Sequence, residues 1–262
     1  MQAAAFSLEG RAALITGAGS PSGIGFACAR LLGELGAAVF VTSTTGRAGE
    51  RASELRAGGI TAEGAPGDLT DEADVERVVG QALDTLGRID ILVNNAGMTS
   101  VTVSGAPEAG QLAGVSPDAW RASIARNLDS VFLVSRAVVP HMQRIGWGRV
   151  IAIASVTGPV MAMRAEAAYA ASKAGVTGLM RSIALDYGRD GITANAVAPG
   201  WIATGSQTAD EAAEGSRTPA GRSGSPEEVA GAVAWLASPA GAYVTGQCIV
   251  VDGGNSIAEQ RS

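Results

Sequence analysis

Short apolar runs alternate with segments whose apolar residues recur at helical spacing along nearly the whole chain. The runs are apolar at most positions, which is typical of strands covered by helices on both faces. The pattern predicts an α/β fold: a single domain, residues 1–262, built on a doubly wound parallel sheet of about seven strands. The expected strands are 12–16, 38–43, 61–68, 89–95, 149–155, 192–199 and 247–254. The expected helices are 24–35, 50–57, 75–86, 117–142, 169–187 and 226–237.

Two long stretches, 98–116 and 203–225, break this alternation and are rich in Gly, Ser, Thr and Pro. Both are longer than ordinary connections in a compact domain. Each follows the carboxyl end of an expected strand, and this is the edge at which open α/β sheets bind ligands. We therefore expect both stretches to be loops that contact the substrate.

Composition narrows the classes of function. The chain of 262 residues is 47% hydrophobic and carries a formal net charge of −6. These values fit a soluble protein and disfavour nucleic acid or an anionic membrane as a partner.

No apolar run approaches the ~18 residues of a membrane span and no secretory signal is evident, so we expect a cytoplasmic protein. His141, Cys28 and Cys248 match no metal-site spacing, and no metal is expected.

The stretch "TGAGSPSGIG" (16–25) joins the first expected strand to the first expected helix. Free backbone N–H groups in such a turn, together with the positive end of the helix dipole, suit a pyrophosphate. By itself the pattern is equally typical of a sharp turn. A Walker-type phosphate loop is excluded because no Gly-Lys-Ser or Gly-Lys-Thr follows.

The tip of the second expected strand bears on the choice of cofactor. An acidic residue there would bind the adenosine ribose of NAD, whereas the tip reads "TSTTGR" (42–47) and holds no acid. Hydroxyl groups and Arg47 would suit a 2′-phosphate, which favours NADP(H) over NAD(H). The alternative is that Arg47 is an ordinary solvated loop residue.

A Tyr-x-x-x-Lys pair supplies candidate chemistry. Tyr169 and Lys173 in "YAASK" are neighbours on one helix face. A nearby ammonium would lower the phenol pKa from its usual ~10 by roughly 1 to 3, which suits a general acid or base for an alcohol and carbonyl couple. Ser155, at the end of the preceding strand, would reach the same crevice. Pairs of this spacing also arise by chance as surface or cation–π contacts.

Together these segments resemble the short-chain dehydrogenase/reductase family from end to end. The matching pieces are "TGAGSPSGIG", "GDLTD" (67–71), "NNAG" (94–97), Asn127 in "ARNLDSVF", Ser155, "YAASK", "APGWIAT" (198–204), "GRSGSPEEVA" (221–230) and "VTGQCIVVDGG" (244–254). The resemblance implies a Rossmann-type fold and hydride transfer between a nicotinamide cofactor and a carbonyl or alcohol substrate. Members that reduce 3-oxoacyl groups on acyl carrier protein look most similar.

The resemblance implies a role for each matching residue. The catalytic set would be Asn127, Ser155, Tyr169 and Lys173. Tyr169 would exchange the proton with the substrate oxygen, and Ser155 would orient that oxygen. Lys173 would hold the nicotinamide ribose, and Asn127 would maintain a water-linked proton relay to it. The expected cofactor-binding residues are Gly17, Ser20, Ser22, Gly23, Ile24, Gly25, Ser43, Thr44, Thr45, Arg47, Asp68, Leu69, Asn95, Ala96, Gly97, Tyr169, Lys173, Pro199, Gly200, Ile202 and Thr204.

Parts of this set face different parts of the cofactor in the family. Residues 68–69 would contact adenine, residues 95–97 the central portion, and residues 199–204 the nicotinamide end. Thr44 matches a position that helps to receive the 2′-phosphate in NADPH-using members. The resemblance also implies a homotetramer, or a dimer, that forms through the two long helices, 117–142 and 169–187.

The chain departs from the family pattern in three places. Its phosphate loop carries two extra residues, and Ser22 stands where NADP-dependent members often have a basic residue. The stretch Ser20-Pro21-Ser22 lengthens the loop beside the adenosine phosphates. We expect its hydroxyl and N–H groups, which come from the two serines, to replace that charge. The segment between Gly97 and Asn127 and the spacing of Ser155 from Tyr169 are also longer than usual.

The leading hypothesis is an NADPH-dependent ketone or 3-oxoacyl reductase. An NAD-dependent secondary alcohol dehydrogenase of the same family is the nearest alternative. A non-catalytic nucleotide-sensing module is a second alternative, although such proteins usually lose a catalytic residue. A serine hydrolase using Ser155 and Lys173 is a third, and it lacks the Gly-x-Ser-x-Gly elbow.

Overall fold

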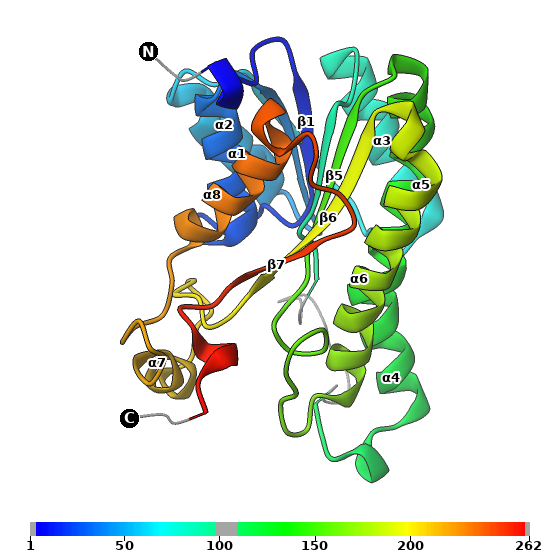
Figure 1. The fold of residues 1–262 in the computed structure, drawn as a ribbon. Helices are drawn as coiled ribbons and strands as arrows, with labels where there is room; N and C mark the ends of the chain where they lie inside the picture. The colour runs from blue at the N-terminus through cyan, green and yellow to red at the C-terminus, as the bar shows by residue number, and fades with distance from the viewer. Residues whose placement is uncertain (1–3, 98–108, 260–262) are drawn as a thin grey trace.

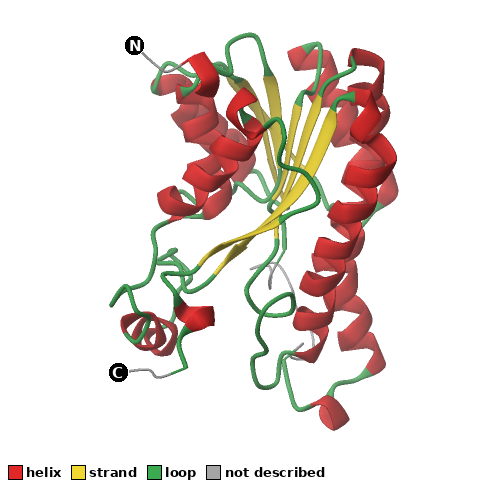
Figure 2. Cartoon of the chain, viewed as in Figure 1, coloured by secondary structure: helices red, strands yellow, loops and turns green. Residues whose placement is uncertain are grey.

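Seven parallel strands form one sheet between two layers of helices (Figure 1, Figure 2). The computed structural model describes residues 4–97 and 109–259. The strands are β1 (Ala12–Ile15), β2 (Ala38–Ser43), β3 (Ala62–Pro66), β4 (Ile91–Asn94), β5 (Gly148–Ile153), β6 (Ile192–Pro199) and β7 (Cys248–Val251). Their order across the sheet is β3-β2-β1-β4-β5-β6-β7. This arrangement confirms the predicted doubly wound fold.

Helices cover both faces of the sheet, as Figure 1 shows. One layer holds α1, α2 and α8, and the other holds α3, α4, α5 and α6. The helices are α1 (Ile24–Glu34), α2 (Arg47–Ala57), α3 (Glu72–Leu86), α4 (Pro117–Ile124), α5 (Ser130–Ile145), α6 (Ala167–Tyr187), α7 (Ala209–Ser216) and α8 (Pro226–Ala237). No helix in the described part of the chain is long and apolar enough to cross a membrane.

The apolar strands separate two cores. Along β1, Ala13 and Ile15 pack into the core under α1 and α8, whereas Leu14 packs into the core under α3, α5 and α6. Successive side chains of a strand point to opposite faces, so a strand buried on both faces is apolar at most positions. The four strands at the centre, β1, β4, β5 and β6, are buried throughout.

The order of the strands places a crevice between β1 and β4. From β1 the chain builds the sheet outward through β2 and β3, and it then returns to the other side of β1 with β4. Helices leave neighbouring strands on opposite faces at such a switch point, which opens a crevice at the carboxyl ends of the strands. The segments that follow β1 and β4 are "TGAGSPSGIG" and "NNAG".

The structure corrects some expected boundaries. The stretch 203–225 is not all loop, since α7 lies within it and begins at a capping box between Thr208 and Glu211. The expected helix 117–142 consists of α4, a π-helical turn at Ala125–Asp129 and α5. Most strands are one to three residues shorter at one end or both than expected, whereas β2, β6 and α8 match. Of the stretch 98–116, residues 98–108 lie outside the described residues.

Candidate active site

The turn after β1 needs its glycines. Gly17 has a φ of +67°, and a Cβ there would lie 2.7 Å from the Cα of Ala96. A Cβ on Gly25 would lie 2.5 Å from Nδ2 of Asn95. At the start of α1 the N-cap residue Gly23 provides no side-chain cap, so the first N–H groups of the helix have no capping acceptor. A glycine cradle under an uncapped helix N-terminus fits the pyrophosphate of a dinucleotide.

Asn95 locks this turn to the segment after β4. Its Nδ2 donates to the carbonyl oxygens of Thr16 and Gly17, at 3.0 Å each. The hydroxyl of Thr16 accepts from the backbone N–H groups of Asn95 and Ala96, at 3.0 and 2.9 Å. The Asn95 amide therefore connects the two loops of the crevice and holds the cradle in position.

The tip of β2 places Arg47 beside the phosphate loop. The Arg47 Nε donates to the Thr45 hydroxyl at 3.0 Å, and the Ser43 hydroxyl donates to the Thr45 carbonyl at 2.9 Å. A Cβ on Gly19 would lie 3.6 Å from Cβ of Arg47. Within the described residues, neither Nη of Arg47 has a hydrogen-bond partner, so these donors remain for a ligand. Thr44 is exposed at the same tip.

Gly97, Asn127 and Lys173 form one cluster at the carboxyl edge. A Cβ on Gly97 would lie 2.9 Å from Oδ1 of Asn127 and 3.2 Å from Nζ of Lys173. Asn127 is buried in the π-helical turn, and its Nδ2 donates to the carbonyl of Ser123 at 3.0 Å. The wide turn explains the inward placement of the amide, and π-turns often occur at functional sites. The sequence prediction that these residues meet agrees with this geometry.

Lys173 is a buried cation on α6. Its Nζ donates to the carbonyl of Ile153 at 2.9 Å and lies 5.6 Å from the centre of the Tyr169 ring. Burial lowers the pKa of the ammonium from 10.5 to about 8. Loss of hydration disfavours a charged group wherever a neighbouring charge does not compensate it. The Lys173 ammonium therefore loses its proton at a lower pH than the ammonium of an exposed lysine does.

Ser155 and Tyr169 contact each other across the same crevice. Ser155 follows β5, and its Oγ accepts from the N–H of Thr157 at 3.1 Å, which fixes the hydroxyl. Burial raises the pKa of the Tyr169 phenol, the hydrogen bond with Ser155 lowers it, and the carboxylates of Glu166 and Glu211 raise it. The expectation that Lys173 lowers this pKa is therefore wrong, because burial dominates the shift and Lys173 is not among its causes.

The end of β6 and the segment that follows it lie beside the segment that carries Ser155. Pro199 is buried at the end of β6 and accepts from the N–H of Val156, next to Ser155, at 3.0 Å. A Cβ on Gly200 would lie 2.7 Å from Cβ of Asp252. Ile202 forms a bridge with Gly224. Thr204 shares a hydrogen bond with Ser206.

Ser22 contacts the segment before α7, and its expected place beside the adenosine phosphates stays a prediction. Its Oγ accepts from the N–H of Gly205 at 3.1 Å, so the extra residues of the phosphate loop contact the segment before α7. Asp68 is exposed after β3 and accepts from the N–H and the hydroxyl of Thr70. Leu69 is buried beside it. The adenine role of these two residues stays a prediction.

Sequence reasoning missed some neighbours of the site. Glu166 and Glu211 act on the Tyr169 phenol, and Asn255 donates to the sulfur of Met161 at 3.7 Å. The position of Glu211 in the first turn of α7 could have been predicted, because Thr208-x-x-Glu211 is the signature of a capping box at the start of a helix. The contact of Asn255 with Met161 joins segments that are far apart in the chain, and no local pattern encodes it, whereas Glu166 lies only three residues before Tyr169.

The fold and the site together define a dinucleotide-binding oxidoreductase of the doubly wound α/β class. A family model described as "Enoyl-(Acyl carrier protein) reductase" matches residues 17–256. The chain is 40% identical over 252 residues to the 3-oxoacyl-[acyl-carrier-protein] reductase FabG of Vibrio cholerae, covering 95% of this chain and 98% of that protein.

Other relatives have other substrates. The chain is 40% identical to the cis-4-hydroxycyclohexanecarboxylate dehydrogenase of Sinomonas cyclohexanicum, covering 93% of this chain and 96% of that protein. A gluconate 5-dehydrogenase from Burkholderia cenocepacia, solved with NADP and tartrate, superimposes with a TM-score of 0.88 at 38% identity, covering 97% and 98% of the two chains. The chain belongs to the short-chain dehydrogenase/reductase family and is an oxidoreductase that acts on CH–OH and C=O groups.

Proposed function

We propose that this protein is an NADPH-dependent reductase whose substrate is a ketone of the 3-oxoacyl class. The observation that carries the proposal is the grouping of Asn127, Ser155, Tyr169 and Lys173 at the carboxyl edge, beside the glycine cradle after β1. A nucleotide-sensing module would not need all four side chains. A serine hydrolase using Ser155 would leave the cradle without a purpose.

The residues have complementary roles in carbonyl reduction. The nicotinamide, when bound, supplies the hydride, and the chain supplies the oxygen site and the proton. Ser155 and Tyr169 would hold the carbonyl oxygen between two hydroxyl groups, which fixes its orientation. Because burial raises the Tyr169 pKa, the phenol is protonated at neutral pH and would donate its proton to that oxygen. Lys173 and Asn127 would return a proton to Tyr169 from the interior side.

The cofactor assignment rests on Arg47 and on a related structure. The Burkholderia cenocepacia enzyme holds NADP, and the β2 tip of this chain offers a guanidinium group beside Gly19 and no carboxylate. A charge-assisted hydrogen bond contributes roughly 1.5–3 kcal/mol, so Arg47→Gln would raise the KM for NADPH about tenfold to a hundredfold. The KM for NADH would not change. An equal loss with both cofactors would contradict a 2′-phosphate role, and Arg56→Gln on the same helix is the control.

The substrate is tested by following NADPH oxidation. A 3-oxoacyl thioester should give the highest kcat/KM in a panel that also contains simple ketones, diketones and an enoyl thioester. The enoyl thioester belongs in the panel because the description of the family model names that substrate type. Preferred reduction of the enoyl substrate would overturn the role of Ser155 and Tyr169 as a carbonyl oxygen site.

Two of the relatives support a second candidate, the oxidation of a secondary alcohol that carries a carboxylate. Their names are gluconate 5-dehydrogenase and cis-4-hydroxycyclohexanecarboxylate dehydrogenase. Incubation with NADP and hydroxy acids at alkaline pH would reveal this activity. A higher kcat/KM for a hydroxy acid than for any oxo compound would favour it.

A homotetramer and a cytoplasmic location stay predictions. Light scattering would test the homotetramer.

A further inference from the structure

A cavity of about 330 Å³ lies at the amino edge of the sheet, opposite the candidate active site. It is bounded by the first residues of β1 and β2, the residues before β3, and the ends of α1 and α3. Its lining surface is more polar than apolar, and several of its residues are glycines, among them Gly36 and Gly59. Its charged residues are Arg11 and Arg88. The volume lies at the lower end of the range of small-molecule sites.

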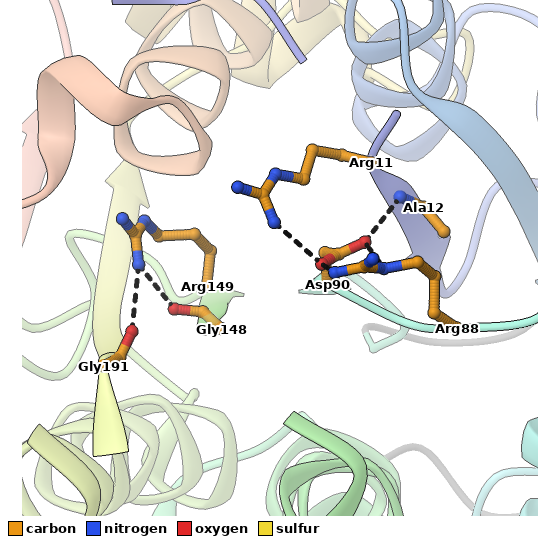
Figure 3. Close-up of polar contacts among 7 residues, drawn as sticks. All are labelled: Arg11, Ala12, Arg88, Asp90, Gly148, Arg149 and Gly191. Carbon is orange, nitrogen blue, oxygen red and sulfur yellow. Dashed lines mark hydrogen bonds and ion pairs between the residues drawn. The ribbon is translucent and has the colours of Figure 1, made fainter. Parts of the chain in front are cut away.

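One buried carboxylate holds both arginines in place. Asp90 accepts from Nη1 of Arg11 at 3.1 Å, from Nε of Arg88 at 2.8 Å and from the N–H of Ala12 at 3.0 Å (Figure 3). Its side chain is fully buried, whereas those of Arg11 and Arg88 are 30% and 39% exposed. The carboxylate therefore fixes the two guanidinium groups at the wall of the cavity.

Both arginines keep unused donors. Nε and Nη2 of Arg11 and Nη1 of Arg88 have no hydrogen-bond partner within the described residues. Arg11 also stacks on the Trp147 ring, 3.8 Å from its centre. A guanidinium that is stacked and ion-paired loses little conformational freedom when it binds a ligand.

Positive charge is in excess at this edge. Arg149 stacks on Trp147 at 4.2 Å, and its buried Nε has no partner among the described residues. Burial and the nearby Arg11 lower the pKa of Arg149 to about 10. Of these three guanidinium groups, those of Arg11 and Arg88 pair with the carboxylate of Asp90, and that of Arg149 has no ion pair among the described residues. The ends of α1 and α3 offset about half a charge each, and the carboxylate of Glu9 lies on an exposed residue where solvent screens it.

We propose that this cavity binds the oxyanion group of a small organic molecule, a carboxylate or a phosphate, through Arg11 and Arg88. Both groups accept paired hydrogen bonds from guanidinium donors. The glycine-rich wall leaves room for a compact apolar body next to the anion. The site is separate from the cofactor cradle and does not depend on the function proposed above.

Calorimetric titration of the full-length protein tests the proposal. The protein is first saturated with NADPH, so that the phosphate contacts of the cofactor cradle are occupied. Phenyl phosphate and benzoate are the two probes, and benzamide is the neutral control of the same shape. We expect one of the two anions to bind with 1:1 stoichiometry, which distinguishes phosphate from carboxylate. Absence of binding by both anions, or equal binding of benzamide, would overturn the proposal.

Variants then locate the site. Arg88→Gln should weaken anion binding at least tenfold, and Arg121→Gln, a surface arginine on α4, should leave it unchanged. If Arg88→Gln does not fold, Thr61→Glu replaces it, since Thr61 is exposed at the cavity and its new carboxylate would compete for the arginines. Binding that survives Thr61→Glu, or that disappears when NADPH is present, would place the anion elsewhere and refute this site.

Discussion

The two edges of the sheet bury charge in different surroundings. At the amino edge, the buried carboxylate of Asp90 accepts hydrogen bonds from two guanidinium groups and a backbone N–H. At the carboxyl edge, Lys173 is buried with the carbonyl of Ile153 as its hydrogen-bond acceptor, and no ion pair among the described residues includes it. The two sites belong to the same strands, and β4 and β5 connect them.

This difference distinguishes the buried charge of Asp90, which stabilises the fold, from the buried charge of Lys173, which is available for the reaction. A buried ion retains its usual charge when donors surround it, and a buried ion without a counter-charge shifts its pKa instead. Such shifts are typical of functional sites. Variants at the two edges should therefore fail in different ways, one in activity and the other in stability.

The largest effect is expected for Tyr169→Phe. Loss of a general acid usually lowers the rate by about 10²- to 10⁴-fold, so kcat should fall by this factor. The free energy of unfolding and the Kd for NADPH should stay close to those of the wild type. Steady-state kinetics and a fluorescence titration of NADPH measure the two quantities. Wild-type turnover across the ketone panel would refute the proton role of Tyr169.

Asp90→Asn should give the opposite result. The substitution leaves Arg11 and Arg88 without their shared carboxylate, which we expect to cost roughly 3 kcal/mol of stability, at the lower end for a broken buried pair because both arginines are partly exposed. Urea unfolding measures the loss. The kcat of the folded fraction should not change, and a large fall in kcat would show that the two edges are coupled.

Lys173 predicts a pH dependence of stability. The fall of its pKa from 10.5 to about 8 corresponds to about 3 kcal/mol. Between these pH values the unfolded chain binds more protons than the folded chain, so the wild type gains stability as the pH rises from 8 to 10.5. Lys173→Met should lack this gain. Parallel stability curves for the two proteins over this window would contradict a shifted lysine.

The smallest effect is expected for Ser22→Ala. The substitution removes the hydrogen bond to Gly205 and so loosens the segment before α7, at a cost of about 1 kcal/mol. The KM for the ketone should rise by roughly fivefold. The Kd for NADPH should remain unchanged. A selective loss of NADPH affinity would instead support the phosphate role that the sequence suggests for Ser22.

The sheet and much of the active site could be predicted because their signals are local. Each central strand is apolar at most positions; Ser155 follows the end of β5, and Tyr169 and Lys173 lie on α6, the next helix along the chain, which brings the three residues to one edge. The pKa of Tyr169 could not be predicted, because the burial that raises it most and the approach of Glu211 come from the tertiary structure. For the same reason, neither the contact of Ser22 with Gly205 nor the grouping of Arg11, Arg149 and Trp147 follows from spacing.

The π-helical turn at Ala125–Asp129 adjusts the rotational phase between two helices. Each residue advances an α-helix by about 100°, so one additional residue in a wide turn changes the direction of a single side chain without displacing the helix that follows. Val131, Val134 and Val138 keep their place in the core beneath α5, while Asn127 turns inward. Removing one residue from this turn would close it to an ordinary α-helix, so Asn127 would lose its inward direction while α5 kept its rotational phase.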